Sequence, residues 1–463
     1  MRIIICGVGR VGLSIASYLS MHNDDITIVD SDPQLVKRVS DTYDIKGVVG
    51  YASQPDILES AGANEADVII AVTDCDEVNM VACQVAHSVF GVNKKIARIR
   101  NKEYRNAEWS NLFSRNHMPI DVIISPEEAI ADAILNRMSV PGTTNDISLL
   151  DQTVHLAGFL IDHGNPSIGN SLKDLHLTNK DIDFDIFLLL RDASPIEFDQ
   201  NTKLQARDEL YFICKKKDLL PLLESLGNQN DIYNGNIVLS GGGVIGEAVA
   251  TKIIENDNFK KNKLIIIENN LHRGHALNSK VKNALVIHGS ALDYDILKEA
   301  GTDTASLFIS VMNSNENNIL SAVLAKKMGT HYSIALNNNK IYSQLIPDHL
   351  IDAIVNPEVI TVSGVLHNLR RGYIRSINTI RHTGVEIIEA EVSNECSIAN
   401  IPVRDMNLPE NIKILGVFSS EKQEFSLIKD DTVIKSKDYV IVVSYGAAVE
   451  EVEKLFSFSI SLF

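Results

Sequence analysis

Two glycine-rich hexapeptides carry the residues of this sequence that are best suited to chemistry. In a G-x-G-x-x-G turn from strand to helix, the first glycine permits a tight turn and the second lets the backbone approach a pyrophosphate. The third lets the helix pack closely on the sheet, and the helix N-terminus offers free N–H groups to the anion. Both hexapeptides therefore predict dinucleotide-binding loops, formed by Gly7, Val8, Gly9, Arg10, Val11 and Gly12, and by Gly241, Gly243 and Gly246.

The context of each hexapeptide makes this weak motif more specific. Each one follows an apolar strand, opens an amphipathic helix, and precedes a second strand that ends in an acid. Asp30 lies 18 positions after Gly12, and Glu268 lies 22 positions after Gly246. An acid at this place accepts hydrogen bonds from ribose hydroxyls. The alternative is a tight turn in an empty Rossmann scaffold, which is the stronger rival in the second half.

The surroundings of Asp30 favour one class of nucleotide. Its carboxylate would repel a 2′-phosphate, and the next residues, Ser31 and Asp32, supply no arginine to receive one. NAD-type or adenosine nucleotides are therefore expected rather than NADP. In the second half Arg273 lies five residues after Glu268, a spacing that assigns it no contact.

Further ligand contacts are expected after the fourth and fifth strands of the first half. Thr73 and Asp74 follow the fourth strand, where they could hydrogen-bond a nucleotide or cap the next helix. Arg98 and Arg100 alternate along the fifth strand, so they could meet phosphate charge or form an edge-strand ion pair. The second half has 313–315 (Asn-Ser-Asn) and 335–337 (Ala-Leu-Asn) at these places. The first half is therefore the better candidate nucleotide site.

The elements that position these residues occur twice along the chain. Strands at 3–6, 26–29 and 68–72 alternate with helices, which predicts a parallel, doubly wound sheet. The same order restarts after residue 235, with the three motif glycines each shifted by 234 positions and the matching tripeptides 56–58 and 295–297 shifted by 239. A register kept over so many positions indicates an internal duplication.

A smaller piece follows each Rossmann piece. The breaks at Pro141-Gly142 and Arg371-Gly372 are followed by short strands, and each piece closes with a strand and a helix, at 209–213 and 219–226 and at 439–443 and 449–456. A polar linker at 227–231 separates the halves. The expected fold class is α/β, with two doubly wound Rossmann lobes that are each followed by a small α+β lobe. The expected boundaries are 1–140, 141–227, 234–372 and 373–463.

Composition excludes several classes of function. The 463-residue chain has a formal net charge of −17, which argues against nucleic acid or anionic lipid as a partner. No apolar run is long enough to span a membrane, and the N-terminus is expected to begin in the first strand without a signal peptide, so a cytoplasmic protein without membrane insertion is expected. The five cysteines show no C-x-x-C spacing, so neither a disulfide framework nor a zinc site is expected.

The equipment of several enzyme classes is missing. No G-K-[ST] follows either glycine loop, and the sequence contains no H-x-x-x-H metal spacing and no G-x-S-x-G elbow. The small pieces leave little room for a catalytic domain that could enclose a substrate. We therefore expect a protein that is not an enzyme, with an NAD-dependent oxidoreductase as the alternative.

The duplication and the glycine loops resemble the TrkA family, the nucleotide-binding subunits of bacterial Trk potassium-uptake systems, over essentially all 463 residues. Specific stretches of the resemblance are 25–30, 76–86, 96–100 and 321–329; 313–315 departs from it, because acids are expected there. The resemblance implies tandem regulator-of-potassium-conductance (RCK) units and a homo-tetrameric ring on the inner face of the cell membrane. It also implies binding of NAD(H), with ATP or ADP possible at the same sites, and gating of a TrkH-type potassium transporter. A regulator of potassium efflux, which shares these lobes, is the other alternative.

Overall fold

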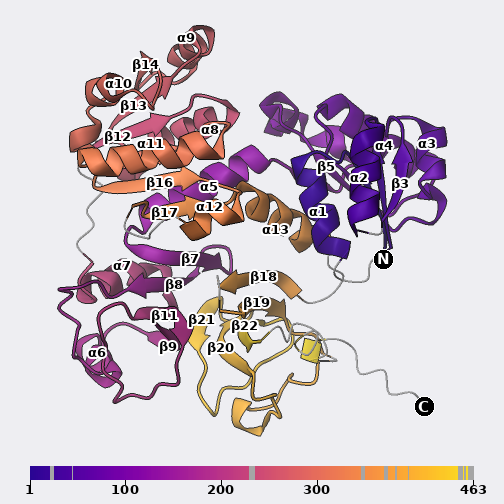
Figure 1. Ribbon diagram of the computed structural model, residues 1–463. Coiled ribbons are helices and arrows are strands. Elements are labelled where there is room, and N and C mark those ends of the chain that lie inside the picture. The colour runs from indigo at the N-terminus through magenta and orange to yellow at the C-terminus, as the bar shows by residue number, and fades with distance from the viewer. Residues whose placement is uncertain are drawn as a thin grey trace, which may run out of the picture.

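A computed structural model shows two similar halves, each with a larger parallel-sheet lobe and a smaller antiparallel-sheet lobe (Figure 1). It describes residues 1–20, 25–43, 45–228, 235–345, 350–369, 374–380, 383–394, 396–446, 452 and 455–456. The break expected at Arg371-Gly372 lies outside the described residues, as do part of the linker at 227–231 and most of the helix expected at 449–456.

The first Rossmann lobe is a parallel six-stranded sheet in the order β3-β2-β1-β4-β5-β6. The inner strands are buried along almost their whole length, as expected for strands that have helices on both faces. This order places the glycine loop after β1 and the loop after β4 side by side at the carboxyl edge of the sheet. The elements are β1 (Arg2–Cys6), α1 (Arg10–Ser20), β2 (Asp25–Asp30), α2 (Pro33–Tyr43), β3 (Lys46–Val49), α3 (Pro55–Ser60), β4 (Val68–Ala71), α4 (Asp76–Ser88), β5 (Lys94–Arg98), β6 (Val122–Ile124) and α5 (Pro126–Ser139).

The second Rossmann lobe repeats this topology as β14-β13-β12-β15-β16-β17, all parallel. The repeat confirms the doubly wound sheets expected from the alternation of strands and helices. Its elements are β12 (Asn236–Ser240), α8 (Val244–Glu255), β13 (Lys263–Glu268), α9 (Leu271–Lys280), β14 (Ala284–His288), α10 (Tyr294–Glu299), β15 (Leu307–Ser310), α11 (Asn315–Met328), β16 (Tyr332–Leu336), α12 (Lys340–Leu345), β17 (Ala353–Val355) and α13 (Pro357–Leu369).

Each small lobe is an antiparallel five-stranded sheet, ordered β10-β9-β11-β8-β7 in one half and β21-β20-β22-β19-β18 in the other. The strands expected at 209–213 and 439–443 are the central strands β11 and β22, and the helix expected at 219–226 is α7. The elements are β7 (Thr143–Leu149), β8 (Val154–Leu160), α6 (Leu172–Thr178), β9 (Phe184–Arg191), β10 (Ser194–Pro195), β11 (Glu209–Lys215), α7 (Lys216–Ser225), β18 (Ile374–Ile380), β19 (Val385–Glu391), β20 (Ile412–Ser419), β21 (Glu424–Leu427) and β22 (Tyr439–Tyr445).

The two halves exchange their last Rossmann helices. Helix α5 of the first half buries Ile130, Ile134 and Met138 in the core of the second Rossmann lobe, against α8. Helix α13 of the second half buries Val365 and Leu369 in the core of the first Rossmann lobe, against α1. Figure 1 shows both helices between the two Rossmann lobes. The sequence pattern does not reveal which sheet each of these helices covers.

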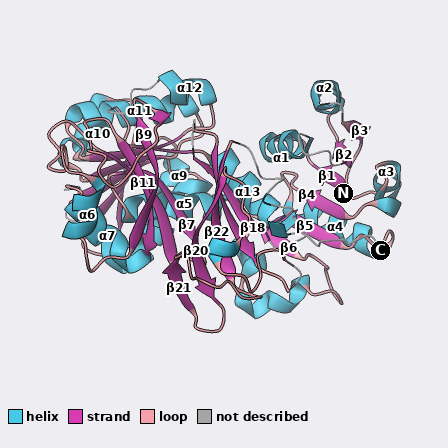
Figure 2. Ribbon diagram, turned by 90° about the horizontal axis from the view of Figure 1, so that it is seen from below, coloured by secondary structure: helices cyan, strands magenta, loops and turns pink. Residues whose placement is uncertain are grey.

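The small lobes share one core in which the inner faces of their two sheets meet. Leu156, Phe187 and Ile213 of the first lobe join Ile387 and Ile441 of the second in a single cluster of buried side chains. In the view of Figure 2 the strands of both sheets lie next to each other. The Tyr445 hydroxyl donates a hydrogen bond of 2.7 Å to the Phe187 carbonyl across this junction. The halves are therefore joined both at the exchanged helices and at the small lobes.

Candidate functional site

The first glycine loop links the end of β1 to the start of α1, and its glycines are needed for different reasons. Gly7 has a φ of +94°, and a Cβ there would lie 2.8 Å from the Thr73 backbone. A Cβ on Gly12 would lie 1.8 Å from the Gly7 carbonyl oxygen. A Cβ on Gly9 would meet no atom within 4 Å. The fold therefore requires Gly7 and Gly12, whereas Gly9 keeps open the space where a pyrophosphate approaches such a loop.

Asp30, at the end of β2, is held beside this loop by two backbone N–H groups. Its Oδ2 accepts the Val8 N–H at 2.7 Å, and its Oδ1 accepts the Asp32 N–H at 2.9 Å. Asp32 in turn accepts the Gln34 N–H in the first turn of α2. Because a carboxylate oxygen has two lone pairs, Asp30 keeps acceptor capacity for ribose hydroxyls while it is oriented by the loop.

The residues after β4 are organised by a buried amide. The Asn79 Oδ1 accepts both the Thr73 N–H and the Thr73 hydroxyl, and its Nδ2 donates to the carbonyls of Thr73 and Arg98. The Thr73 hydroxyl is therefore engaged inside the protein, while Asp74 is fully exposed at the edge of the crevice. The sequence alone does not indicate this role for Asn79. The only signal for it is that the second half has an asparagine, Asn318, at the corresponding position 239 residues later.

The two arginines of the first half make ion pairs with different helices. The Arg98 Nη2 donates to the Glu127 Oε1 at 2.7 Å in the first turn of α5, and its Nη1 lies 3.9 Å from Asp74. The Arg100 Nε lies 3.7 Å from the Asp76 Oδ1 at the start of α4. Strand β5 ends at Arg98 and lies between β4 and β6, so Arg98 does not form an edge-strand pair, and Arg100 lies two residues after the strand on which it was expected. Among the described residues the buried Arg98 Nε has no hydrogen-bond partner.

The second glycine loop has the same geometry around a more deeply buried acid. Gly241 has a φ of +101°, a Cβ on Gly246 would lie 1.9 Å from the Gly241 carbonyl oxygen, and a Cβ on Gly243 would meet nothing within 4 Å. Glu268 is buried, and its oxygens accept the N–H groups of Gly242 at 2.6 Å and Asn270 at 2.8 Å. The second loop therefore has the same backbone geometry for a phosphate as the first.

The carboxyl edge of the second sheet is uncharged where the first is charged. Asn315 replaces Asp76 and accepts the Asn338 N–H, as Asp76 accepts the Arg100 N–H. Leu336 replaces Arg98, and the Glu358 of α13 instead accepts a hydrogen bond of 2.7 Å from the Asn338 amide. The hydrogen-bond framework is kept, but charge that could attract a phosphate is lost.

Three charged residues that the sequence gives no reason to connect form a network beside the second loop. The Arg273 Nε donates to the Gly242 carbonyl at 2.6 Å, and its Nη2 donates to the Glu247 carboxylate at 2.6 Å. Lys280 donates to the other Glu247 oxygen at 2.9 Å. The sequence spacing between Arg273 and Glu268 does not predict the contact of Arg273 with Glu247, because Glu247 lies on a different helix, α8.

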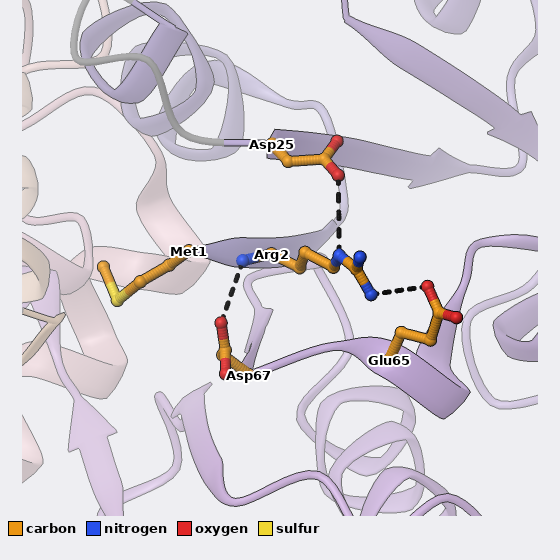
Figure 3. A pocket seen from close by; sticks show the side chains of 5 residues that line it. All are labelled: Met1, Arg2, Asp25, Glu65 and Asp67. Atoms are coloured by element: carbon orange, nitrogen blue, oxygen red, sulfur yellow. Dashed lines mark hydrogen bonds and ion pairs between the residues drawn. The ribbon is translucent and has the colours of Figure 1, made fainter.

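A hollow at the opposite edge of the first sheet is a structural ion-pair network. Met1, Arg2, Asp25, Glu65 and Asp67 line it (Figure 3). Arg2 makes an ion pair of 2.5 Å with Glu65 and lies 3.9 Å from Asp25, while its backbone N–H donates to Asp67. These residues lie near the N-terminal ends of β1 and β2, whereas nucleotides bind such sheets at the carboxyl edge.

Comparisons with known proteins match both repeats. The TrkA-N domain model matches residues 3–126 and 237–357, and the TrkA-C domain model matches 156–227 and 387–457. The Trk system potassium uptake protein TrkA of Azorhizobium caulinodans is 36% identical over 463 residues, which are all of both chains. The protein of the same name from Vibrio alginolyticus is 34% identical over 460 residues, 98% of each chain.

Solved structures share the fold at low sequence identity. The GsuK RCK domain has a TM-score of 0.59 at 16% identity and covers 98% of this chain and 94% of its own. The GsuK channel bound to NAD has a TM-score of 0.58 at 16% identity, with 98% of this chain and 78% of that chain covered. The arrangement of two Rossmann lobes and two small lobes therefore occurs in another protein of solved structure.

Proposed function

The chain belongs to the TrkA family of Trk system potassium uptake proteins, and on that premise we propose that NAD(H) binding at its first Rossmann lobe regulates a membrane potassium transporter. Family membership makes the chain a regulatory subunit of potassium uptake with RCK domains, and not an enzyme. It also favours uptake over the efflux and oxidoreductase alternatives.

The observation that carries the proposal is the pairing of an open Gly9 with an oriented Asp30. Gly9 is a glycine that the fold itself does not need, since a Cβ there would meet no protein atom within 4 Å. Asp30 is fixed by Val8 and Asp32 at the place where a ribose binds in such lobes. We assign the pyrophosphate to Gly7, Val8, Gly9, Arg10, Val11 and Gly12, with Thr73, Asp74, Arg98 and Arg100 at the far end of the crevice.

Chemistry supports NAD(H) over NADP, because the Asp30 carboxylate would face the 2′-phosphate. The GsuK channel, which shares the fold, has been solved with NAD bound. ATP or ADP carry the same adenosine diphosphate unit, so they are candidates for the same crevice. In the second lobe Gly241, Gly243, Gly246 and Glu268 form the corresponding site, which we rank as the weaker of the two.

We further propose a homo-tetramer under a TrkH-type transporter, on the inner face of the cell membrane, with lobe boundaries at 1–140, 141–227, 234–372 and 373–463. Within the part of the chain that the structure describes, no helix is long and apolar enough to cross a membrane. The net charge of −17 disfavours direct contact with anionic lipid. A nucleotide would then shift the ring by its difference in affinity between two states, a coupling of about 1–3 kcal/mol.

The first prediction tests the loop with a substitution that the fold tolerates. Gly9→Asp places a side chain and a negative charge in the open space, so we expect loss of nucleotide binding at the first lobe without loss of folding. Isothermal titration with NAD(H) measures affinity and stoichiometry, and thermal unfolding checks the fold. Wild-type affinity and stoichiometry in this variant would refute the site.

A matched control is available in the second loop. Gly243→Asp makes the same change at a position that is equally open. We expect it to leave the tighter of the two binding events intact. Likewise Asp30→Ala should cost more affinity than Glu268→Ala, and the reverse order would overturn the ranking of the two lobes.

A further inference from the structure

The second glycine loop is covered by a charge network, here called the loop triad, that consists of Glu247, Arg273 and Lys280. The Arg273 guanidinium donates to the carbonyl oxygens of Gly242 at 2.6 Å and Gly243 at 3.3 Å. It also holds the Glu247 carboxylate at 2.6 Å, and Lys280 holds the other carboxylate oxygen at 2.9 Å. The triad thus connects the loop, the first turn of α8 and the helix α9.

The first lobe has the same fold without these charges. Leu13, Leu35 and Thr42 occupy the positions that correspond to Glu247, Arg273 and Lys280. A Rossmann lobe of this family therefore forms without the triad. The second loop therefore has two cationic side chains and one carboxylate close to its glycines that the first loop lacks.

The Glu247 carboxylate is anionic and only partly exposed. Burial raises the pKa of Glu247, but the hydrogen bond from Lys280 and the charges of Arg273 and Lys280 lower it further, so that the pKa lies below its ordinary value. About a fifth of its side chain is exposed. An anion with two cationic partners beside a helix N-terminus has the arrangement that a bound phosphate would also have.

We propose that Glu247 is an internal competitor for nucleotide phosphate at the second loop, which holds Arg273 and Lys280 until a phosphate displaces it. This inference rests on the proposed nucleotide function. It adds that the Glu247 carboxylate regulates the affinity of the second loop for nucleotide. A guanidinium binds a phosphate as readily as a carboxylate. The Arg273 Nη2 can therefore exchange the Glu247 carboxylate for a phosphate while the Nε stays on the Gly242 carbonyl. The second loop then binds an adenosine diphosphate unit weakly because it must first release its own carboxylate.

The experiment measures nucleotide binding at the second loop alone, in the full-length chain. A Gly9→Asp background removes the first site, and ADP and NAD are titrated by calorimetry into this background with and without Glu247→Gln. We expect Glu247→Gln to tighten binding by about fivefold to a hundredfold, the range of typical coupling energies. Adding Arg273→Gln should abolish the gain. Glu255→Gln, which removes the same charge from the other end of α8, should have no effect.

A purely structural triad predicts the opposite result. Unchanged or weaker binding in Glu247→Gln, with an unchanged thermal midpoint, overturns the proposal, and so does an absence of second-loop binding in every variant. If Glu247→Gln lowers the thermal midpoint, Glu247→Asp keeps the charge and retracts the carboxylate by one methylene. We expect from it a smaller gain of the same sign, and a loss overturns the proposal.

The proposed function fails by a different result. If Gly9→Asp leaves the stoichiometry of the wild-type chain unchanged, the first-lobe assignment is wrong whatever Glu247 does. If Gly9→Asp removes one binding event and Glu247→Gln does not strengthen the remaining one, the function stands and only the role of the triad is refuted.

Discussion

At the scale of single residues, similar sequence motifs conceal different physical roles. Gly12 is required by the backbone, because a Cβ there would collide with the Gly7 carbonyl, whereas a Cβ on Gly9 would meet no protein atom within 4 Å. The sequence predicts both glycines and the acids Asp30 and Glu268 from spacing. It does not predict that Arg98 pairs with Glu127, because their partnership depends on where α5 begins in space.

Cysteine reactivity gives a prediction at this scale. Cys75 is exposed beside Asp74, whereas burial raises the pKa of Cys83 to about 12 and also raises the pKa of Cys6 and Cys214. Since the thiolate is the reactive form, only Cys75 should react quickly with iodoacetamide at pH 8. Mass spectrometry of labelled peptides measures this, and NAD should slow the reaction by covering the crevice.

The control for this experiment is Cys75→Ser, in which rapid labelling should disappear. Rapid modification of Cys83 in the folded protein would contradict the burial that raises its pKa. Protection of Cys75 by NAD in the Gly9→Asp variant would contradict the site instead, because that variant should not bind at the first lobe.

At the scale of elements, the carboxyl ends of β4 and β5 are held in place by one side chain. The fully buried Asn79 of α4 bonds to the Thr73 backbone and to the Arg98 carbonyl, and Asn318 repeats the arrangement with Met312 and Leu336. The structural role of such a residue is hard to predict from one sequence, because an asparagine within a helix indicates only a low helix propensity at that position. The internal repeat was the available signal.

We predict that Asn79→Ala lowers the free energy of unfolding by about 2–4 kcal/mol, because it leaves buried backbone groups without partners. Urea denaturation followed by circular dichroism measures the change. The same helix supplies a control in Gln84, whose side-chain amide donates to the nearby Ser88 hydroxyl, so Gln84→Ala should change stability by less than about 0.5 kcal/mol. Equal effects of the two substitutions would refute the structural role of Asn79.

At the scale of the whole molecule, the four-lobe order and the sheet topology follow from the alternation of strands and helices and from the repeat register. The way in which the halves combine does not. Amphipathic helices such as α5 and α13 show that one face is buried, but the sequence does not state against which sheet. The exchange was therefore beyond prediction, as was the common core of the small lobes.

The exchange predicts that the halves are not independent proteins. A fragment of residues 1–228 would expose Ile130, Ile134 and Met138, which are each fully or almost fully buried in the intact chain. Burying such a side chain is worth about 1.5–3 kcal/mol. We expect each half to self-associate when expressed alone and the two halves to form a 1:1 complex when co-expressed, as measured by size-exclusion chromatography with light scattering. A stable monomer of residues 1–228 would contradict the prediction.

Helix α5 has a consequence for the communication between the two crevices. Its first turn holds Arg98 of the first crevice through Glu127, and the rest of the helix lies in the core that supports the second glycine loop. A ligand that draws Arg98 away therefore acts on the end of a rod about 21 Å long whose other contacts belong to the second lobe. We therefore expect that nucleotide binding at the first crevice changes the affinity of the second crevice, and that the two crevices do not bind independently.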